Sequence, residues 1–599
     1  MALITKLVLF GLGLVGSVAS SPVASSRQAA PTVSVKNGSY AGIYSAEYDQ
    51  DYFLGIPYAQ AKLIRIKKPE RFALAKGLDE AWDGIHQATA YPKHCYGYGS
   101  DQIGYEQSED CLYLNIVRPA GIKNTAKLPV VAWIHGGGLF MGGSADRRYN
   151  LSFIVDRSVE MGTPVIGVSF NYRVTALGFL CGDEALDAGI TNNGFRDQRL
   201  ALRWINENIR SFGGSPKKVT IVGESSGAES VSAQVFAYNG RDDGLFRGAI
   251  AQSGFGGAIG RFPGGFNATV DMQATYDALV GNVTSCASLV GSDKSLDCLR
   301  KAPFDEINHA LNVTAVGPWP PVLDHDFIAD YPHNQLAKGR FPKAPVLIGA
   351  NSDEGTAFGS GKGPNRGGVN SDAEMRDAIA KIIPDDVEEH SGKSVEQVID
   401  ELMEVYPNDQ KVGIPSLKTW PHVIEPNDTY AEAFGLQYRR TGALFGDFSM
   451  QYQRRRANIA WAKRGIPSYT YRFDVTVNGV LPVIGATHFQ EVAFVFRNLN
   501  GDGYDTNPFG GNGTYPAQAK ALATVISSAW INFVTGLDPN GKKGHLFSKK
   551  TTWPVYDVSR GKTGKGIVFD VNGSFVETDD WRADGMGWFA EHGLTVFGN

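Results

Sequence analysis

The sequence predicts an α/β fold in which a large, mostly parallel central sheet is flanked by helices. The first observation is that short apolar runs rich in β-branched residues alternate with stretches of helical spacing. The second is that glycine-containing turns follow several of these runs. The composition is that of a globular chain of 599 residues, with 43% hydrophobic and 20% charged residues.

The expected elements follow the order that such a sheet requires. We expect strands at residues 128–135, 163–173, 218–223, 246–254 and 344–355. We expect helices at residues 197–209 and 227–237. The polar stretch 372–432 has helical character and predicts a subdomain over the site, whereas residues 498–513 indicate a loop. Because ligands bind at the carboxyl ends of parallel strands, functional residues are expected there.

The N-terminus has the pattern of a secretory signal peptide, which we assign to residues 1–20. Lys6 lies in a short n-region, an apolar run from Leu7 to Val15 follows, and small residues surround Ala19. The alternative is a membrane anchor, but the run is shorter than the roughly 20 residues that a span needs. We therefore expect a secreted protein with no stable membrane anchor. Residues 21–31 are expected to be disordered, and residues 32–599 to form one domain.

The cysteines agree with export. Cys95 and Cys111 lie close in sequence, as do Cys286 and Cys298, and each pair could close a small loop. Cys181 is the odd one, and we expect it to be a buried thiol. No C-x-x-C motif occurs, so the pattern does not favour a zinc site, and no metal is expected.

The net charge argues against one class of partner, and the glycosylation motifs agree with export. The net charge of −5 argues against nucleic acid as a partner. Acceptors of the N-x-S/T type are spread along the chain, as on the surface of a secreted glycoprotein. They begin at Asn37, Asn150, Asn267, Asn282, Asn312, Asn427, Asn512 and Asn572.

Ser225 is the candidate nucleophile. The motif Gly-Glu-Ser-Ser-Gly alone is weak, since chance gives roughly half a G-x-S-x-G match in a chain of this composition. Its context is stronger, because the motif follows an expected strand and precedes an expected helix, as a nucleophile elbow requires. Gly223 and Gly227 remove side chains that would clash in the turn. The positive end of the helix would favour an anionic intermediate.

A serine nucleophile also needs donors for an oxyanion. "WIHGGGLFMGG" lies at the end of another expected strand, and the N–H groups of Gly136–Gly138 could point at an oxygen. The N–H of Ser226 would add a further donor. A phosphate-binding loop is the alternative, but neither G-x-x-x-x-G-K-[ST] nor G-x-G-x-x-G occurs here.

The base and the acid are sought further along the chain. His488 follows an apolar, strand-like run and a glycine-containing turn, whereas His135 more naturally supports the oxyanion loop. Asp353 and Glu354 come just after an expected strand. Adjacent residues point to different sides, so one of the two is expected to face the site. The order serine, acid, histidine is that of α/β-hydrolases.

With these motifs the chain resembles the type-B carboxylesterase/lipase family, and its pattern is nearest to secreted fungal members. The similar blocks run through most of the chain from residue 53 onward. They are "FLGIPYA", "SEDCLYLNI", "NYRVTALGFL", "DQRLALRWI", "SFGGSPKKVTIVGESSGA", "AQSG", "NSDEG" and "HFQEVAFVF". The resemblance implies an α/β-hydrolase fold with helical excursions over the active site, and residues 32–599 as its catalytic domain.

The resemblance also implies roles by position. Ser225 would be the nucleophile, Glu354 the acid, rather than Asp353, and His488 the base. Oxyanion donors would be the N–H groups of Gly137, Gly138 and Ser226.

Supporting roles are implied for two further residues. Glu224 would tune the site electrostatically, and Ser253 would support the acid–base pair. The resemblance pairs Cys95 with Cys111 and Cys286 with Cys298. Family members need no cofactor, and the partner would be a small-molecule ester.

One departure bears on the substrate. In lipases of this family the loop closed by Cys95 and Cys111 is a long amphipathic lid, whereas here it is short and polar, with three tyrosines at positions 96, 98 and 105. We therefore expect a secreted serine carboxylesterase acting on small to medium, fairly apolar esters. The alternatives are a lipase or sterol esterase, an esterase or lactonase that tailors secondary metabolites, and a non-catalytic adhesion protein. The oligomeric state is not predicted.

Overall fold

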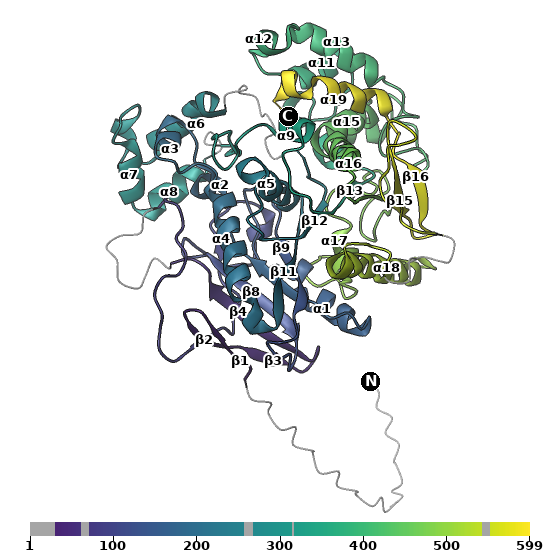
Figure 1. The fold of residues 1–599 in the computed structure, drawn as a ribbon. Helices are drawn as coiled ribbons and strands as arrows, with labels where there is room; N and C mark the ends of the chain where they lie inside the picture. Colours follow the sequence, from purple (N-terminus) through teal and green to yellow (C-terminus); the bar gives the residue numbers. More distant parts are fainter. Residues whose placement is uncertain (1–29, 61–70, 257–267, 314–316, 542–550, 599) are drawn as a thin grey trace, which may run out of the picture.

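A computed structural model describes residues 30–60, 71–256, 268–313, 317–541 and 551–598 (Figure 1). The expected signal peptide, most of the expected disordered stretch and Asn267 lie outside the described residues. Folded structure begins with a small sheet of three strands, ordered β1-β2-β5. Its strands are β1 (Thr32–Val35), β2 (Gly38–Ala41) and β5 (Ile85–Gln87).

The centre of the molecule is an 11-stranded sheet with the order β16-β15-β14-β13-β12-β11-β9-β10-β8-β4-β3. The strands from β10 through β9 and β11 to β15 pair in parallel, and the outer strands pair antiparallel. Their bounds are β3 (Ile43–Ser45), β4 (Gln50–Pro57), β8 (Tyr113–Pro119), β9 (Leu128–Ile134), β10 (Ile166–Phe170), β11 (Gly214–Glu224), β12 (Gly248–Gln252), β13 (Val346–Asn351), β14 (Ser468–Phe473), β15 (Lys565–Phe569) and β16 (Phe575–Thr578). The mostly parallel sheet is thus confirmed.

The sheet separates two cores. Along β9, Val130, Ala132 and Ile134 face the first core, and Val131 and Trp133 face the second, as the two-residue period of a strand requires. Helices α4 (Asn193–Asn208) and α5 (Ser226–Gly240) contribute to the first core. Helices α1 (Leu151–Glu160), α17 (Val492–Phe496) and α18 (Tyr515–Gly536) contribute to the second (Figure 1).

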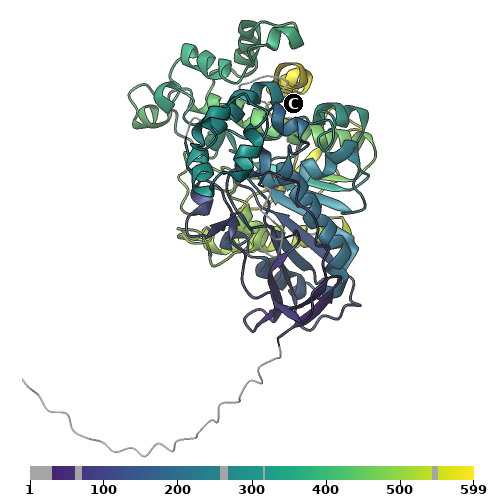
Figure 2. The ribbon, with the colours of Figure 1, turned by 90° about the vertical axis from the view of Figure 1, so that its left-hand side faces the viewer.

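The remaining helices lie around this sandwich and include the expected helical stretch 372–432. They are α2 (Thr175–Phe179), α3 (Asp183–Asp187), α6 (Ala268–Asn282), α7 (Ser295–Lys301), α8 (Phe304–Leu311), α9 (Pro332–Lys338), α10 (Gly355–Phe358), α11 (Asp372–Ala380), α12 (Val387–Ser391), α13 (Val395–Val405), α14 (Thr429–Phe434), α15 (Tyr438–Gly446), α16 (Tyr452–Lys463) and α19 (Ala583–Phe597). Helices α11 and α13 share a separate small core with α19. Figures 1 and 2 both place this group at the opposite end of the molecule from β1 and β2.

The sequence-based boundaries need small corrections. The helix expected at 197–209 begins earlier, at Asn193, and the strand expected at 163–173 is shorter, at Ile166–Phe170. The apolar run before His488 is not a strand. Residues 481–486 form turns, because Pro482 lacks an N–H and because β14 already pairs with both of its sheet neighbours. The expected loop at 498–513 contains neither helix nor strand.

Candidate active site

Ser225 lies in a sharp turn between β11 and α5. Its backbone has φ 57° and ψ −129°, a conformation that side-chain-bearing residues rarely adopt. The turn requires its glycines, since a Cβ on Gly227 would lie 2.2 Å from the carbonyl oxygen of Ile134. The N–H of Ser225 donates to the carbonyl of Gln252 at 2.9 Å, which ties the turn to the neighbouring strand β12. The Ser225 side chain is half-buried at the end of the sheet.

The glycine-rich loop after β9 lies beside this turn. A Cβ added to Gly136 would lie 3.1 Å from the Cβ of Ser225. Gly137 and Gly138 adopt positive φ angles of 102° and 66°. A hydrogen bond of 3.0 Å from the N–H of Leu139 to the hydroxyl of Ser226 fixes the loop to the start of α5. From the sequence, only a backbone role was expected for Ser226, and this side-chain bond was not foreseen.

His135 supports the same loop, as the sequence suggested. Its buried ring stacks on Tyr172, and its Nδ1 lies 3.0 Å from the carbonyl oxygen of Gly136. Burial lowers the pKa of His135 to about 4, so the ring is neutral at physiological pH.

His488 and Glu354 form a direct hydrogen bond. Nδ1 of His488 lies 2.7 Å from Oε2 of Glu354, and the Glu354 side chain is 0% exposed. The other carboxylate oxygen, Oε1, accepts from the hydroxyl of Ser253 at 2.5 Å and from the N–H of Asn351 at 2.8 Å. Ser253 follows β12, Glu354 follows β13 and His488 follows β14, so neighbouring strands bring these residues together.

Of the two adjacent acids, Glu354 contacts His488 and Asp353 does not. Asp353 accepts from the N–H of Ala486 at 2.8 Å, and its own N–H donates to the Ala486 carbonyl at 2.9 Å. These bonds anchor the loop that carries His488. The two neighbours point to different sides, as expected from their adjacency.

The second ring nitrogen of His488 faces the Ser225 turn. Nε2 lies 3.3 Å from Oε1 of Glu224, the residue that precedes the serine. Within the described part of the chain, Nε2 makes no direct hydrogen bond to the Ser225 hydroxyl. Such contacts are often long without substrate and shorten when the substrate binds.

The carboxylates control the charge of the imidazole. Burial lowers the pKa of His488, but the negative charges of Glu354 and Glu224 outweigh burial and raise it above the ordinary value of a histidine. Burial also raises the pKa of Glu224 well above its usual range, and its Oε1 has no hydrogen-bond donor among the described residues. Of the two carboxylates, Glu354 raises the pKa of His488 more, because it is hydrogen-bonded to the ring at 2.7 Å.

Arg148 holds the His488 loop through contacts that could not be inferred from the sequence. The guanidinium of Arg148 lies over the ring of Phe489, 4.6 Å from its centroid. Arg148 also pairs with Asp101 at 2.7 Å and with Asp146 at 2.5 Å. Asp101 belongs to the loop closed by Cys95 and Cys111, so this arginine connects that loop to the residue after His488.

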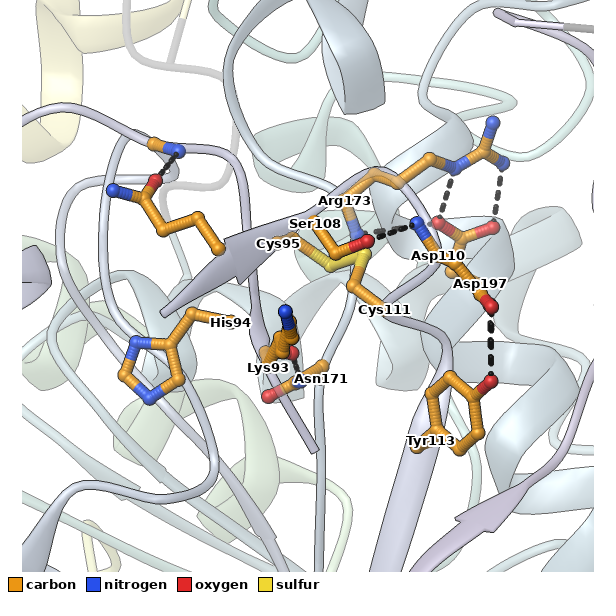
Figure 3. Close-up of a disulfide and its surroundings, with 12 residues drawn as sticks. Lys93, His94, Cys95, Ser108, Asp110, Cys111, Tyr113, Asn171, Arg173 and Asp197 are labelled. Atoms are coloured by element: carbon orange, nitrogen blue, oxygen red, sulfur yellow. Dashed lines mark hydrogen bonds and ion pairs between the residues drawn. A yellow bond between two sulfur atoms is a disulfide. The ribbon is translucent and has the colours of Figure 1, made fainter. Parts of the chain in front are cut away.

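The disulfide between Cys95 and Cys111 closes the loop, with a Cα–Cα distance of 5.0 Å (Figure 3). Strands β6 (His94–Cys95) and β7 (Gln107–Ser108) pair inside it. The hydroxyl of Tyr98 donates to Asn308 at 2.7 Å, and that of Tyr105 accepts from the N–H of Arg147 at 3.2 Å. The loop is thus fastened to the body at several points, and of its apolar side chains Ile103 is strongly exposed, at 78%.

The structure also gives the surroundings of the other cysteines and of the glycosylation acceptors. Cys286 pairs with Cys298, as the resemblance implied, and Cys181 is a buried free thiol. Asn37 is buried and its amide donates to the carbonyl of Glu80, so we expect no glycan there. Asn150 is half-buried and caps α1. The exposed acceptors are Asn282, Asn312, Asn427, Asn512 and Asn572.

Comparisons with known proteins agree with this geometry. Residues 29–572 match the model of the carboxylesterase family. Lipase 1 of Geotrichum candidum is 30% identical over 98% of both chains, and secreted lipase 1 of Botryotinia fuckeliana is 31% identical over 88% of both. The structure of EstA from Aspergillus niger superimposes with a TM-score of 0.75 at 25% identity, over 95% of this chain and 99% of that one. The chain therefore belongs to the carboxylesterase family and is a carboxylic ester hydrolase.

Proposed function

We propose that this protein is a secreted serine carboxylesterase that works through an acyl-enzyme intermediate, with Ser225 as nucleophile, His488 as base and Glu354 as acid. The observation that carries the proposal is the 2.7 Å hydrogen bond between Glu354 and His488 beside the strained turn of Ser225. Glu354 holds the proton of the imidazole on Nδ1, which leaves Nε2 free to accept one.

The reaction follows from these positions. The hydroxyl oxygen of Ser225 attacks the ester carbonyl while its proton moves to Nε2 of His488. The C–O bond of the ester then breaks, and the alcohol leaves with that proton. Water attacks the acyl-enzyme in the same way, giving its proton to His488, and the acid is released as the proton returns to Ser225.

The oxyanion of each tetrahedral intermediate needs donors. The N–H groups of Gly137, Gly138 and Ser226 are the candidates, and one such donor is worth about 3 kcal/mol in the transition state. The hydrogen bond from Leu139 to the Ser226 hydroxyl keeps the loop in place before substrate arrives, so little reorganisation is needed.

Small to medium, fairly apolar esters are the proposed substrates. The loop closed by Cys95 and Cys111 is short and held to the body by tyrosines, which does not suit a lid that lies on a lipid surface. The second candidate is a lipase, since the Geotrichum and Botryotinia relatives are both named lipases. The word secreted in one of those names and the leader-like residues 1–20 support export. Among the described helices, none is long and apolar enough to cross a bilayer.

A panel of esters tests the proposal. Turnover is measured against acyl chain length, with and without an oil–water interface, beside Ser225→Ala. A carboxylesterase works best on short soluble esters and gains nothing from an interface, whereas a lipase prefers long chains and is activated by it. Retention of full activity in Ser225→Ala would rule out the proposed nucleophile.

A further inference from the structure

Glu229 is a carboxylate one helical turn from Ser225 that the proposed reaction does not use. It lies four residues after Ser225, one turn into α5, a helix that Figure 1 shows near the centre of the molecule. Residues one turn apart share a face of a helix, and side chains lean towards the N-terminus. The Glu229 side chain is therefore directed towards the Ser225 turn.

The exposure of the side chains along α5 distinguishes Glu229 from its neighbours. From Ser226 to Ala237, all of which the structure describes, every residue is buried except Glu229, which is half-buried. Glu229 is thus the one position between 226 and 237 on α5 whose side chain is partly accessible. Ser225 and His488 are also half-buried, with the His488 side chain 17% exposed. Glu229, Ser225 and His488 are therefore all partly accessible.

Electrostatics agree with this placement. Burial raises the pKa of Glu229 to about 7, and the positive charge of protonated His488 acts in the opposite direction. An interaction of this kind requires the two groups to be close.

Within the part of the chain that the structure describes, no partner explains why a carboxylate is kept at position 229. Among the described residues, the side chain of Glu229 makes neither a hydrogen bond nor an ion pair. An unpaired charge in such a place destabilises the fold, and an apolar residue would avoid that cost. The other acids nearby do have roles in the protein: Glu354 orients His488, and Glu491 accepts from Gln252 and Asn351.

We propose that Glu229 determines specificity by binding a protonated amine on the substrate, so that the preferred esters carry an ammonium group in the acyl or the alcohol part. The ammonium would donate a charge-assisted hydrogen bond to the carboxylate while the ester carbonyl lies at Ser225. This inference rests on the proposed function and names its substrate class more narrowly.

Matched pairs of esters test the inference at pH 8.0. In the acyl arm, ethyl 3-aminopropanoate is compared with ethyl butanoate. In the alcohol arm, 2-(dimethylamino)ethyl butanoate is compared with 3-methylbutyl butanoate. Each pair has nearly the same shape and differs in charge. The readout is the ratio of kcat/KM for the cationic ester to that for the neutral ester, in the wild type, in Glu229→Gln and in Glu207→Gln.

We expect Glu229→Gln to lower this ratio by about tenfold or more in one arm, which also identifies the part of the substrate that is bound. Glu207→Gln removes a charge from the exposed surface, where Glu207 pairs with Lys36, and should keep the wild-type ratio. An unchanged ratio for Glu229→Gln in both arms overturns the inference. An equal fall in Glu207→Gln also overturns it, because general attraction of cations would then explain the preference.

Two further outcomes of these experiments are interpreted separately. If the wild type hydrolyses no ester, or if Ser225→Ala remains fully active, the proposed function fails and the inference fails with it. If Glu229→Gln does not fold, the inference is tested instead by product inhibition of the wild-type enzyme. The inference then requires 2-(dimethylamino)ethanol to inhibit butanoate hydrolysis more than 3-methylbutan-1-ol, or 3-aminopropanoate to inhibit more than butanoate. Equal inhibition in both pairs overturns it.

Discussion

Replacing Glu354 by glutamine tests the hydrogen bond on which the proposed reaction depends. Oε1 of Glu354 accepts from Ser253 and from the N–H of Asn351, so a glutamine would keep its carbonyl oxygen there. Its NH₂ group would then occupy the place of Oε2, opposite Nδ1 of His488. Two N–H donors cannot face each other, and the imidazole proton would have to move to Nε2.

The size of the effect follows from that tautomer. With a proton on Nε2, His488 cannot accept the proton of the Ser225 hydroxyl. A change of this kind in a serine–histidine–acid site lowers kcat by about 10⁴. This corresponds to about 5 kcal/mol in the activation free energy. Glutamine has nearly the shape of glutamate and keeps two of the three hydrogen bonds, so the fold should survive.

The assay is hydrolysis of a soluble short-chain ester by Glu354→Gln, with thermal unfolding measured in parallel to establish that the variant is folded. Asp353→Asn is the matched control: it changes the adjacent acid, which bonds to Ala486 rather than to His488. We expect this control to lose less than about tenfold. A folded Glu354→Gln variant that also loses less than tenfold would refute the role of Glu354 as the orienting acid.

Three other predictions follow from the same structure. The base His488 must be neutral, and the charge of Glu354 raises its pKa, so kcat/KM should fall as pH decreases, with a midpoint above 6.5; a flat profile between pH 5 and 8 would contradict this. Replacing Cys95 and Cys111 by alanine opens a loop with a sequence separation of 16, which should lower the unfolding free energy by about 3 kcal/mol in a denaturant titration, and an unchanged midpoint would count against it. Mass spectrometry of glycopeptides should find Asn37 unoccupied because its amide is buried, and a glycan there would contradict this expectation.

The fold was predictable from the sequence where hydrophobic patterns are strong. The parallel strands β9 to β13 are short apolar runs buried on both faces, and such runs are recognisable without any partner. The turn before His488 was wrongly interpreted because Leu481–Ala486 is also apolar. Its conformation is set by Pro482 and by bonds from Ala486 to Asp353, more than a hundred residues earlier in the chain.

The candidate site was predictable where chemistry and chain order are enough. The serine, the glycines and the order of acid and histidine are visible in the sequence, whereas contacts between distant side chains are not. The bond from Leu139 to Ser226 and the contact of Arg148 with Phe489 join residues that only the folded chain brings together. Glu229 is different, since a charged residue one turn after the nucleophile could have been noticed from its spacing alone.

The carboxylates near His488 differ in their surroundings, and this difference allows each acid in one site to have its own role. Hydrogen bonds donated to a carboxylate stabilise its charged form, and burial without donors favours the neutral form. Glu354 receives three such bonds and can balance the imidazolium that forms during each step. Glu224 and Glu229 lack comparable donors among the described residues, and burial raises the pKa of both. Because Glu229 is the partly accessible one of these two, a donor for its charge can come from the substrate, and the site would then select its esters with an acid that takes no part in the proton transfers.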